Sequence, residues 1–348
     1  MYPTSRAPRA TLLPLLALAA LASCSPARPV DVAAAGAVPR SRSGDSALGT
    51  IYAEPHVHPD FRAGLLPFSL RFDGVDSPYE TMSAFVMPGQ VFEFSASGGT
   101  GSFSASADAG TLKPAGDSAW QWTAPKAHGN HEIRVHDNGG GETAVLQVFV
   151  LHPYDGGPAI GGFRVGRYQN KPLRDDPAYT RPAGFVEVTR DNLGTMLSPH
   201  FSLSQFTCKG SKQFPTYVAL RSALLVKLEG LVELLARRGL PADSLHVLSG
   251  YRTPAYNRGI GNETTYSRHT YGDAADVFLD RDGDGVQDDL NGDGISNRED
   301  AELLVRLVED TLDASLPPQM AGGLSAYGAT STHGPFLHID TRGHRARW

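Results

Sequence analysis

The sequence predicts two folded parts, an all-β sandwich followed by a domain that mixes helices and strands (α+β). The length of 348 residues corresponds to two or three domains of roughly 100–200 residues each. Residues 51–152 contain segments that alternate polar and apolar side chains, and residues 196–348 combine a helical apolar period with strand-like segments. Hydrophobic residues make up 41% and charged residues 20%, which is typical of a folded chain.

The composition also excludes several classes of protein. A formal net charge of −6 gives no electrostatic reason to bind nucleic acid. Two cysteines are too few for a disulfide scaffold. No apolar run reaches the roughly 18 residues that span a bilayer. The acidity is also uneven, because residues 280–300 hold eight acids and two arginines.

The N-terminus, residues 1–24, is predicted to be an export signal. Two arginines precede a short apolar stretch, residues 12–22, which ends in Leu21-Ala22-Ser23-Cys24. This tetrapeptide resembles the lipobox of bacterial lipoproteins, and the resemblance implies that Cys24 is lipidated and becomes the first mature residue. Ser25 follows in place of Asp, which implies the outer membrane, facing the periplasm. The lipid would hold the protein on the membrane without spanning it.

The next two segments are predicted to be a tether and a sandwich. Residues 25–50 are rich in Ala, Pro, Ser and Gly without periodicity, as in a flexible tether. Within 51–152, strict alternation marks strands at 91–96, 131–136 and 143–150, with glycine-rich turns between them. Trp120 and Trp122 share one strand face and are expected in the core. The strand spacing favours an immunoglobulin-like sandwich.

A connector is predicted at 153–195, where Gly, Pro and Arg are frequent. A helix is expected from about Thr216 to Arg238. Its apolar face is made by leucines at helical spacing: Leu224, Leu228, Leu231 and Leu235. A strand is expected from Leu245 to Ser249, directly before the first of three chemically informative motifs.

These motifs lie between residue 249 and the C-terminal region. The first is Ser249-Gly-Tyr-Arg252-Thr-Pro. The second is Ser267-Arg-His269-Thr-Tyr-Gly-Asp-Ala-Ala-Asp276. The third is Phe336-Leu-His338-Ile-Asp340. Together they resemble the zinc D-alanyl-D-alanine peptidases, the M15 family of peptidoglycan peptidases, over about residues 196–348. The central S-x-H-x-x-G-x-A-x-D pattern is the specific one.

The resemblance implies the α+β fold of hedgehog and D,D-peptidase domains and a catalytic zinc held by His269, Asp276 and His338. Two histidines, one carboxylate and a water form a known catalytic zinc set. It further implies that Arg252 binds a substrate carboxylate or carbonyl, for which a guanidinium is suited, and that Ser267 contacts substrate. An ion pair within the fold for Arg252, and a turn cap for Ser267, remain alternatives.

One departure from the family concerns the general base. Many members have Glu or Asp three residues before the last zinc-binding His, where this chain has Pro335. The ending around His338 and Asp340 resembles that of a murein endopeptidase branch. Asp340 and His333 are therefore the candidates to activate water, which requires a hydrogen-bond path to it. Asp340 is equally suited to orient His338.

The acidic segment 280–300 has calcium-loop spacing, with oxygen donors at positions 1, 3, 5 and 9 and glycine at 6 of each of two repeats. The repeats resemble those of dockerin or thrombospondin type 3 segments. They predict one or two structural Ca²⁺ ions in an insertion after Asp276. The candidate ligands are Asp280, Asp282, Asp284, Val286, Asp288, Asp289, Asn291, Asp293, Ile295, Asn297 and Asp300.

The leading hypothesis is a surface-tethered zinc peptidase that hydrolyses peptidoglycan stem or cross-link peptides. One alternative is a zinc-containing module that binds peptidoglycan without cleaving it, because the usual acid is missing. Another is a calcium-dependent structural or adhesive lipoprotein in which the sandwich carries the function.

Overall fold

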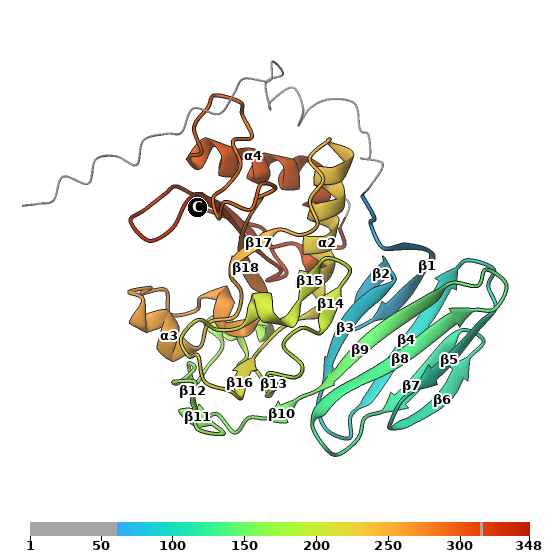
Figure 1. The fold of residues 1–348 in the computed structure, drawn as a ribbon. Helices are drawn as coiled ribbons and strands as arrows, with labels where there is room; N and C mark the ends of the chain where they lie inside the picture. The colour runs from blue at the N-terminus through green and yellow to red at the C-terminus, as the bar shows by residue number, and fades with distance from the viewer. Residues whose placement is uncertain (1–60, 314–315) are drawn as a thin grey trace, which may run out of the picture. The chain divides into compact units, whose positions relative to one another are not determined.

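The computed structural model describes residues 61–313 and 316–348. The first of its folded parts is made of nine strands between Leu65 and Val150 (Figure 1). They form a five-stranded sheet of order β2-β1-β4-β7-β6 and a four-stranded sheet of order β3-β9-β8-β5. The bounds are β1 Leu65–Phe72, β2 Val75–Tyr79, β3 Thr81–Val86, β4 Val91–Gly98, β5 Phe103–Ala107, β6 Thr111–Gly116, β7 Ala119–Thr123, β8 Gly129–Asp137 and β9 Thr143–Val150.

The sandwich core follows from the alternation in the sequence. In β7 the side chains of Trp120 and Trp122 are both buried, while Gln121 between them is exposed. The strands expected at 91–96, 131–136 and 143–150 are confirmed as parts of β4, β8 and β9. The export signal, the tether and Cys24 lie outside the described residues.

The segment expected as a connector, 153–195, contributes strands to the second part of the fold. Strands β10 His152–Pro153, β13 Gly184–Val188 and β16 Thr216–Val218 form a three-stranded sheet. Two further hairpins, β11 Ala159–Ile160 with β12 Phe163–Arg164 and β14 Met196–Ser198 with β15 Phe201–Ser202, flank it. The sequence gives no sign of these strands because such short strands leave little periodicity between glycines and prolines.

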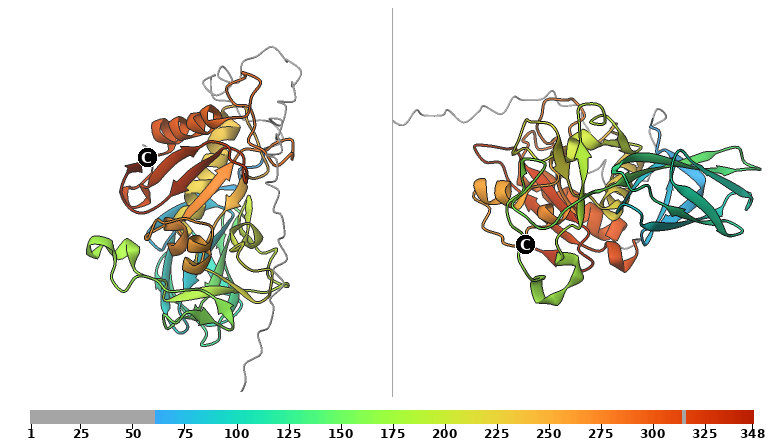
Figure 2. Two further views of the ribbon diagram at one scale, coloured as in Figure 1. Left: turned by 90° about the vertical axis from the view of Figure 1, so that its left-hand side faces the viewer. Right: turned by 90° about the horizontal axis from the view of Figure 1, so that it is seen from below.

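The second part is built on a five-stranded sheet of order β17-β18-β20-β19-β21. All neighbours pair antiparallel except β19 and β21. Helix α4 packs against β19 and β20 of this sheet (Figure 2). The bounds are β17 His246–Ser249, β18 Ala274–Phe278, β19 Gly323–Tyr327, β20 Phe336–Asp340, β21 Ala346–Arg347, α2 Ser222–Arg237, α3 Pro254–Gly259 and α4 Arg298–Leu307.

Helix α2 begins six residues later than the sequence predicts, at Ser222 instead of Thr216. Thr216–Val218 is strand β16, which pairs with β13. Its β-branched and aromatic side chains favour a strand, and the available partner strand decides the outcome. The predicted leucine face is confirmed: Leu224, Leu228, Leu231 and Leu235 are all buried.

Helix α4 follows the acidic segment and starts with a capping box made by Asn297 and Asp300. Asp300 is fully buried, and its carboxylate accepts hydrogen bonds from the backbone of Leu290, Asn291 and Asn297. It thus joins the acidic segment to the helix.

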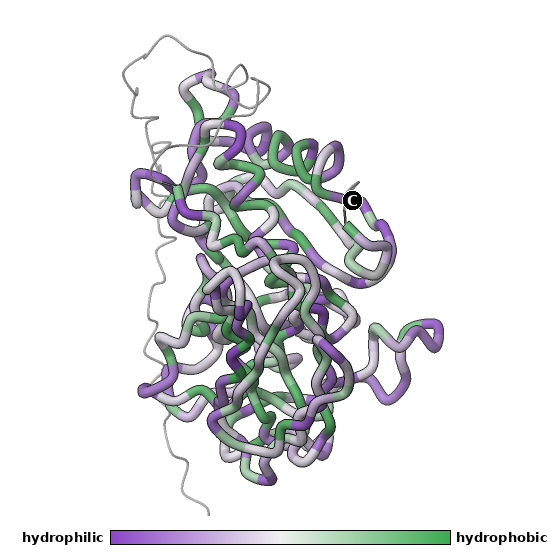
Figure 3. The backbone as a smooth tube through the Cα atoms, turned by 90° about the vertical axis from the view of Figure 1, so that its right-hand side faces the viewer, coloured by the Kyte–Doolittle hydropathy of each residue, from purple (hydrophilic) through white to green (hydrophobic). Residues whose placement is uncertain are grey.

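Hydrophobic residues are frequent along the strands and helices, and hydrophilic residues are frequent in the loops (Figure 3). Among the described helices, none combines the length and apolar character that crossing a membrane requires.

Candidate metal centre and active site

The central strands of the second sheet place two of the predicted zinc ligands side by side. β18 and β20 run antiparallel, with Asp276 directly opposite His338. Directly opposed residues point to the same face of a sheet, so the two side chains meet. Both are almost completely buried. On the other side of β18, Ser249 of β17 lies opposite Asp276.

The third predicted ligand, His269, comes from the short 3₁₀ helix η4 (Arg268–Tyr271), which ends at Gly272. Gly272 has φ = 76°, a conformation that favours glycine. A Cβ at this position would also collide with the backbone of Ala219. The turn that returns the chain from His269 to β18 therefore requires glycine.

The three side chains converge on one point. His269 Nε2 lies 3.1 Å from Asp276 Oδ1 and 3.2 Å from His338 Nδ1, and His338 Nδ1 lies 2.9 Å from Asp276 Oδ1. One ligand atom from each residue lies within 4.8 Å of the others. A tetrahedral zinc ion holds its nitrogen and oxygen ligands at such separations.

Each histidine is also held through its other ring nitrogen. His269 Nδ1 lies 2.8 Å from the carbonyl oxygen of Gly250, and His338 Nε2 lies 3.2 Å from Asp340 Oδ2. If these nitrogens carry the protons, His269 Nε2 and His338 Nδ1 present lone pairs to the common point. The donor set and its outer partners therefore fit zinc.

The electrostatic field at this point favours a cation. Burial lowers the pKa of His338, but Asp276 and Asp340 outweigh burial and raise that pKa to about 9. Two carboxylates thus act on one buried imidazole. A divalent ion at this point would balance the same negative charge while the imidazole rings of His269 and His338 stay neutral.

Asp340 is fully buried and its carboxylate is surrounded by donors. It accepts from the backbone N–H of Gly323 at 2.8 Å and from Arg342 Nε at 3.0 Å, besides its contact with His338. Burial raises the pKa of Asp340, but His338 and Arg342 hold it well below the ordinary range. Of the two roles that the sequence left open, this geometry favours orientation of His338.

Arg252 makes the ion pair within the fold that the sequence analysis gave as one of its two alternatives. Its Nε donates to Ser249 Oγ at 2.7 Å, and its guanidinium forms an ion pair with Asp276. Arg252 therefore orients a predicted zinc ligand, and it also lines the cavity beside the site. Ser267 is 6% exposed and lines the same cavity.

A cavity of about 870 Å³ opens beside the three ligands, which is large enough for a peptide segment. Sequence reasoning missed several residues of its wall. They are the cations Lys209 and Arg342 and the aromatic residues Tyr327 and Trp348. The ring of Trp348 lies 5.2 Å from that of His338. Because these residues stand far apart in the sequence, no local motif marks them.

His333 lies in the loop before β20 and lines this cavity. Its Nδ1 lies 2.8 Å from the carbonyl oxygen of Gly334, and its ring packs edge-on against Phe336 at 5.0 Å. A donated Nδ1–H leaves Nε2 as the proton acceptor of the neutral ring. Pro335, at the usual position of the acid, is buried and carries no proton-transferring group.

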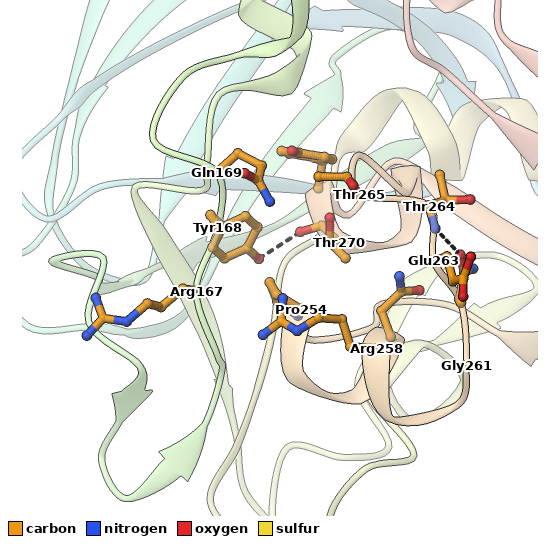
Figure 4. A pocket seen from close by; sticks show the side chains of 13 residues that line it. Arg167, Tyr168, Gln169, Pro254, Arg258, Gly261, Glu263, Thr264, Thr265 and Thr270 are labelled. Atoms are coloured by element: carbon orange, nitrogen blue, oxygen red, sulfur yellow. Dashed lines mark hydrogen bonds between the residues drawn. The ribbon is translucent and has the colours of Figure 1, made fainter.

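A smaller cavity of about 320 Å³ adjoins the first, and the two share Asn262 and Thr264 (Figure 4). The hydroxyl of Tyr168 donates to the carbonyl oxygen of Thr270 at 2.7 Å in its wall. The smaller cavity therefore extends the space beside the predicted zinc ligands.

The structure gathers only some of the predicted calcium ligands. Asp280, Asp282 and Asp288 bring carboxylate oxygens within 4.8 Å of one another. In the second repeat, Asp289 accepts from the backbone of Gly292 and Gly294, and Asp300 caps α4. The second repeat is therefore organised by its own hydrogen bonds.

Comparison with protein families identifies one match. Residues 199–286 match the family model described as Peptidase M15. The matched segment contains Arg252, Ser267, His269 and Asp276, and it ends before His338. This match supports a peptidase domain of the metal-dependent type. No curated protein matches the sequence significantly.

Two solved structures resemble the chain locally. Fibronectin(III)-like modules of Clostridium thermocellum CbhA are 17% identical, with a TM-score of 0.16, and the match covers 23% of this chain and 94% of that one. A titin M10–obscurin-like 1 immunoglobulin complex is 18% identical, with a TM-score of 0.17. This match covers 25% of this chain and 98% of that one. Both scores are low, so the description of the sandwich rests on its strand pairing.

Proposed function

We propose that this protein is a zinc-dependent peptidase that hydrolyses peptide bonds in peptidoglycan stem or cross-link peptides. The observation that supports the proposal most strongly is the convergence of His269, Asp276 and His338 on one point beside a peptide-sized cavity. The Peptidase M15 match over residues 199–286 agrees with it.

The residues around this point have separable roles. When bound, zinc supplies polarisation of the scissile carbonyl and acidifies the attacking water. Asp340 holds the ring of His338, and Arg252 holds the carboxylate of Asp276. His333 is the group placed to accept a proton and return it to the leaving amine, because its Nε2 is the acceptor nitrogen.

Lys209 is suited to bind a substrate carboxylate. It lines the cavity, and among the described residues no carboxylate lies within ion-pair distance of it. Burial and the nearby Arg252 lower its pKa, and the charge of Asp276 offsets them only in part. Stem peptides end in a carboxylate, and such a group would supply the missing charge.

The test is cleavage of purified muropeptides by the full chain with zinc. We expect turnover that disappears on chelation and returns with zinc, and that His269→Gln abolishes. Lys209→Met should raise KM for substrates with a free C-terminal carboxylate, with little change for amidated ones. Lys212→Met, an exposed lysine three residues away, is the matched control.

Two outcomes would contradict the proposal. Muropeptide binding without zinc-dependent cleavage would favour a non-catalytic binding module. Absence of both binding and cleavage would favour the structural or adhesive alternative.

We further propose that the chain is an exported lipoprotein anchored at Cys24. We also propose that a structural Ca²⁺ ion binds the first acidic repeat around Asp280, Asp282 and Asp288.

A further inference from the structure

A second group of metal-binding side chains lies outside the zinc cavity. His128, His152 and Glu187 each bring one ligand atom within 4.8 Å of the other two. None of them lines the cavity beside His269. All three are at least partly accessible; the side chains of His128 and Glu187 are 42% and 26% exposed.

Backbone pairing fixes the positions of all three residues. His128 directly precedes β8, whose first residue, Gly129, pairs with Val150 at the end of β9. One residue separates the end of β9 from the start of β10, so His152, the first residue of β10, lies two residues after Val150. β10 then pairs with β13, which carries Glu187. The cluster therefore follows from consecutive strand pairs.

The separations suit a shared ion better than a hydrogen bond. His128 Nε2 lies 3.6 Å from Glu187 Oε2, beyond hydrogen-bond range. Two ligands of one tetrahedral zinc, each about 2.0–2.1 Å from the ion, lie roughly 3.4 Å apart. The rings of His128 and His152 have their centroids 4.7 Å apart, so both imidazoles reach the same point.

Outer partners orient two of the three side chains. His152 Nδ1 lies 3.1 Å from the carbonyl oxygen of Pro153, which directs Nε2 away as the lone-pair nitrogen. The hydroxyl of Tyr217 donates to Glu187 Oε2 at 2.8 Å, and its ring stands edge-on to His152 at 5.5 Å. Hydrogen-bonded outer partners of this kind are typical of metal ligands.

We propose that His128, His152 and Glu187 form a second zinc site. Two imidazoles and one carboxylate are a donor set that zinc accepts, and the partial exposure leaves a fourth position for water. An ion there would tie the start of β8 to β13. The site is independent of the proposed peptidase activity.

The test measures how many zinc ions the wild type and each variant bind. Metal-free full-length protein, kept in calcium to fill the acidic segment, is titrated with zinc at buffered free concentrations in the micromolar range. We expect two equivalents for the wild type and one for His128→Gln/His152→Gln. His269→Gln/His338→Gln should also bind one, and the quadruple variant none. His136→Gln, at the other end of β8, is the matched control and should bind two.

Glu187→Gln serves as a second variant because it keeps an acceptor for Tyr217 while removing the charge. It should weaken binding of the second equivalent while the circular dichroism spectrum stays unchanged. The proposal is overturned if His128→Gln/His152→Gln, folded by the same criterion, still binds as many zinc ions as the wild type.

Discussion

At the scale of the residue, the candidate site depends on how His338 is held between two carboxylates. Asp276 faces one ring nitrogen and Asp340 the other. The first is a predicted zinc ligand, and the second is enclosed by Gly323 and Arg342. An aspartate enclosed in this way orients its neighbour and is poorly placed to exchange protons with a substrate.

Asp340→Asn tests this assignment, because it preserves size and removes charge. We expect zinc affinity to fall by about 10–100-fold, as for other carboxylates that orient a zinc-binding histidine. Competition with a chromophoric chelator measures the affinity. At saturating zinc, much of the activity should return. If affinity is unchanged while kcat collapses, Asp340 acts as the base.

The convergence of His269, Asp276 and His338 could be predicted from the sequence, but much of the cavity wall could not. His269 and Asp276 lie within one ten-residue motif, whose glycine marks the turn. Lys209 and Trp348 belong to segments far from that motif in the sequence. Their proximity results from tertiary packing, which has no local sequence period.

At the scale of the element, the available hydrogen-bond partners determine which secondary structure a segment adopts where its local sequence pattern does not. Thr216–Val218 continues an apolar helical pattern. It is nevertheless a strand, because β13 supplies an antiparallel partner for its backbone hydrogen bonds. The capping box of α4 is made by Asn297 and Asp300, and Asp300 also satisfies backbone groups of the acidic segment. Local propensity is weak where another segment supplies the hydrogen bonds.

The acidic segment yields a prediction about stability. Bringing Asp280, Asp282 and Asp288 together without a cation leaves three carboxylate side chains close to one another. Calcium should raise the melting temperature by about 5–10 °C at a free concentration near 100 times its dissociation constant. Differential scanning calorimetry with zinc saturating measures the shift.

Asp282→Asn should reduce this shift, whereas Asp310→Asn, on the helical segment beyond the acidic repeats, should leave it intact. Equal melting temperatures of the wild type in calcium and in chelator would show that the acidic segment needs no calcium ion.

At the scale of the whole molecule, stability is expected to depend on pH through a buried pair. His200, in the turn between β14 and β15, lies 2.6 Å from Glu229 of α2. Burial lowers the pKa of His200, but the hydrogen bond and charge of Glu229 outweigh burial and raise it. This pair stabilises the fold fully below about pH 6.5, the ordinary histidine value, and the stabilisation is lost as pH rises through the raised pKa.

Glu229→Gln should therefore lower the free energy of unfolding more at about pH 6 than at about pH 9. Urea denaturation at both values measures the difference. Glu233→Gln is the matched control on the same helix, because its partner Arg237 stays charged throughout. A pH-independent effect of Glu229→Gln would contradict the linkage.

The antiparallel pairing of β18 with β20 also has a consequence for the order of events during synthesis. Asp276 and His338 are 62 residues apart in the chain, and His269 and His338 are 69 apart. Closing such a loop costs on the order of 4 kcal/mol of chain entropy. At about 5–20 residues per second, several seconds pass on the ribosome between the second ligand and the third. An incomplete chain therefore lacks one of the three residues that converge at the candidate metal centre until β20 has docked.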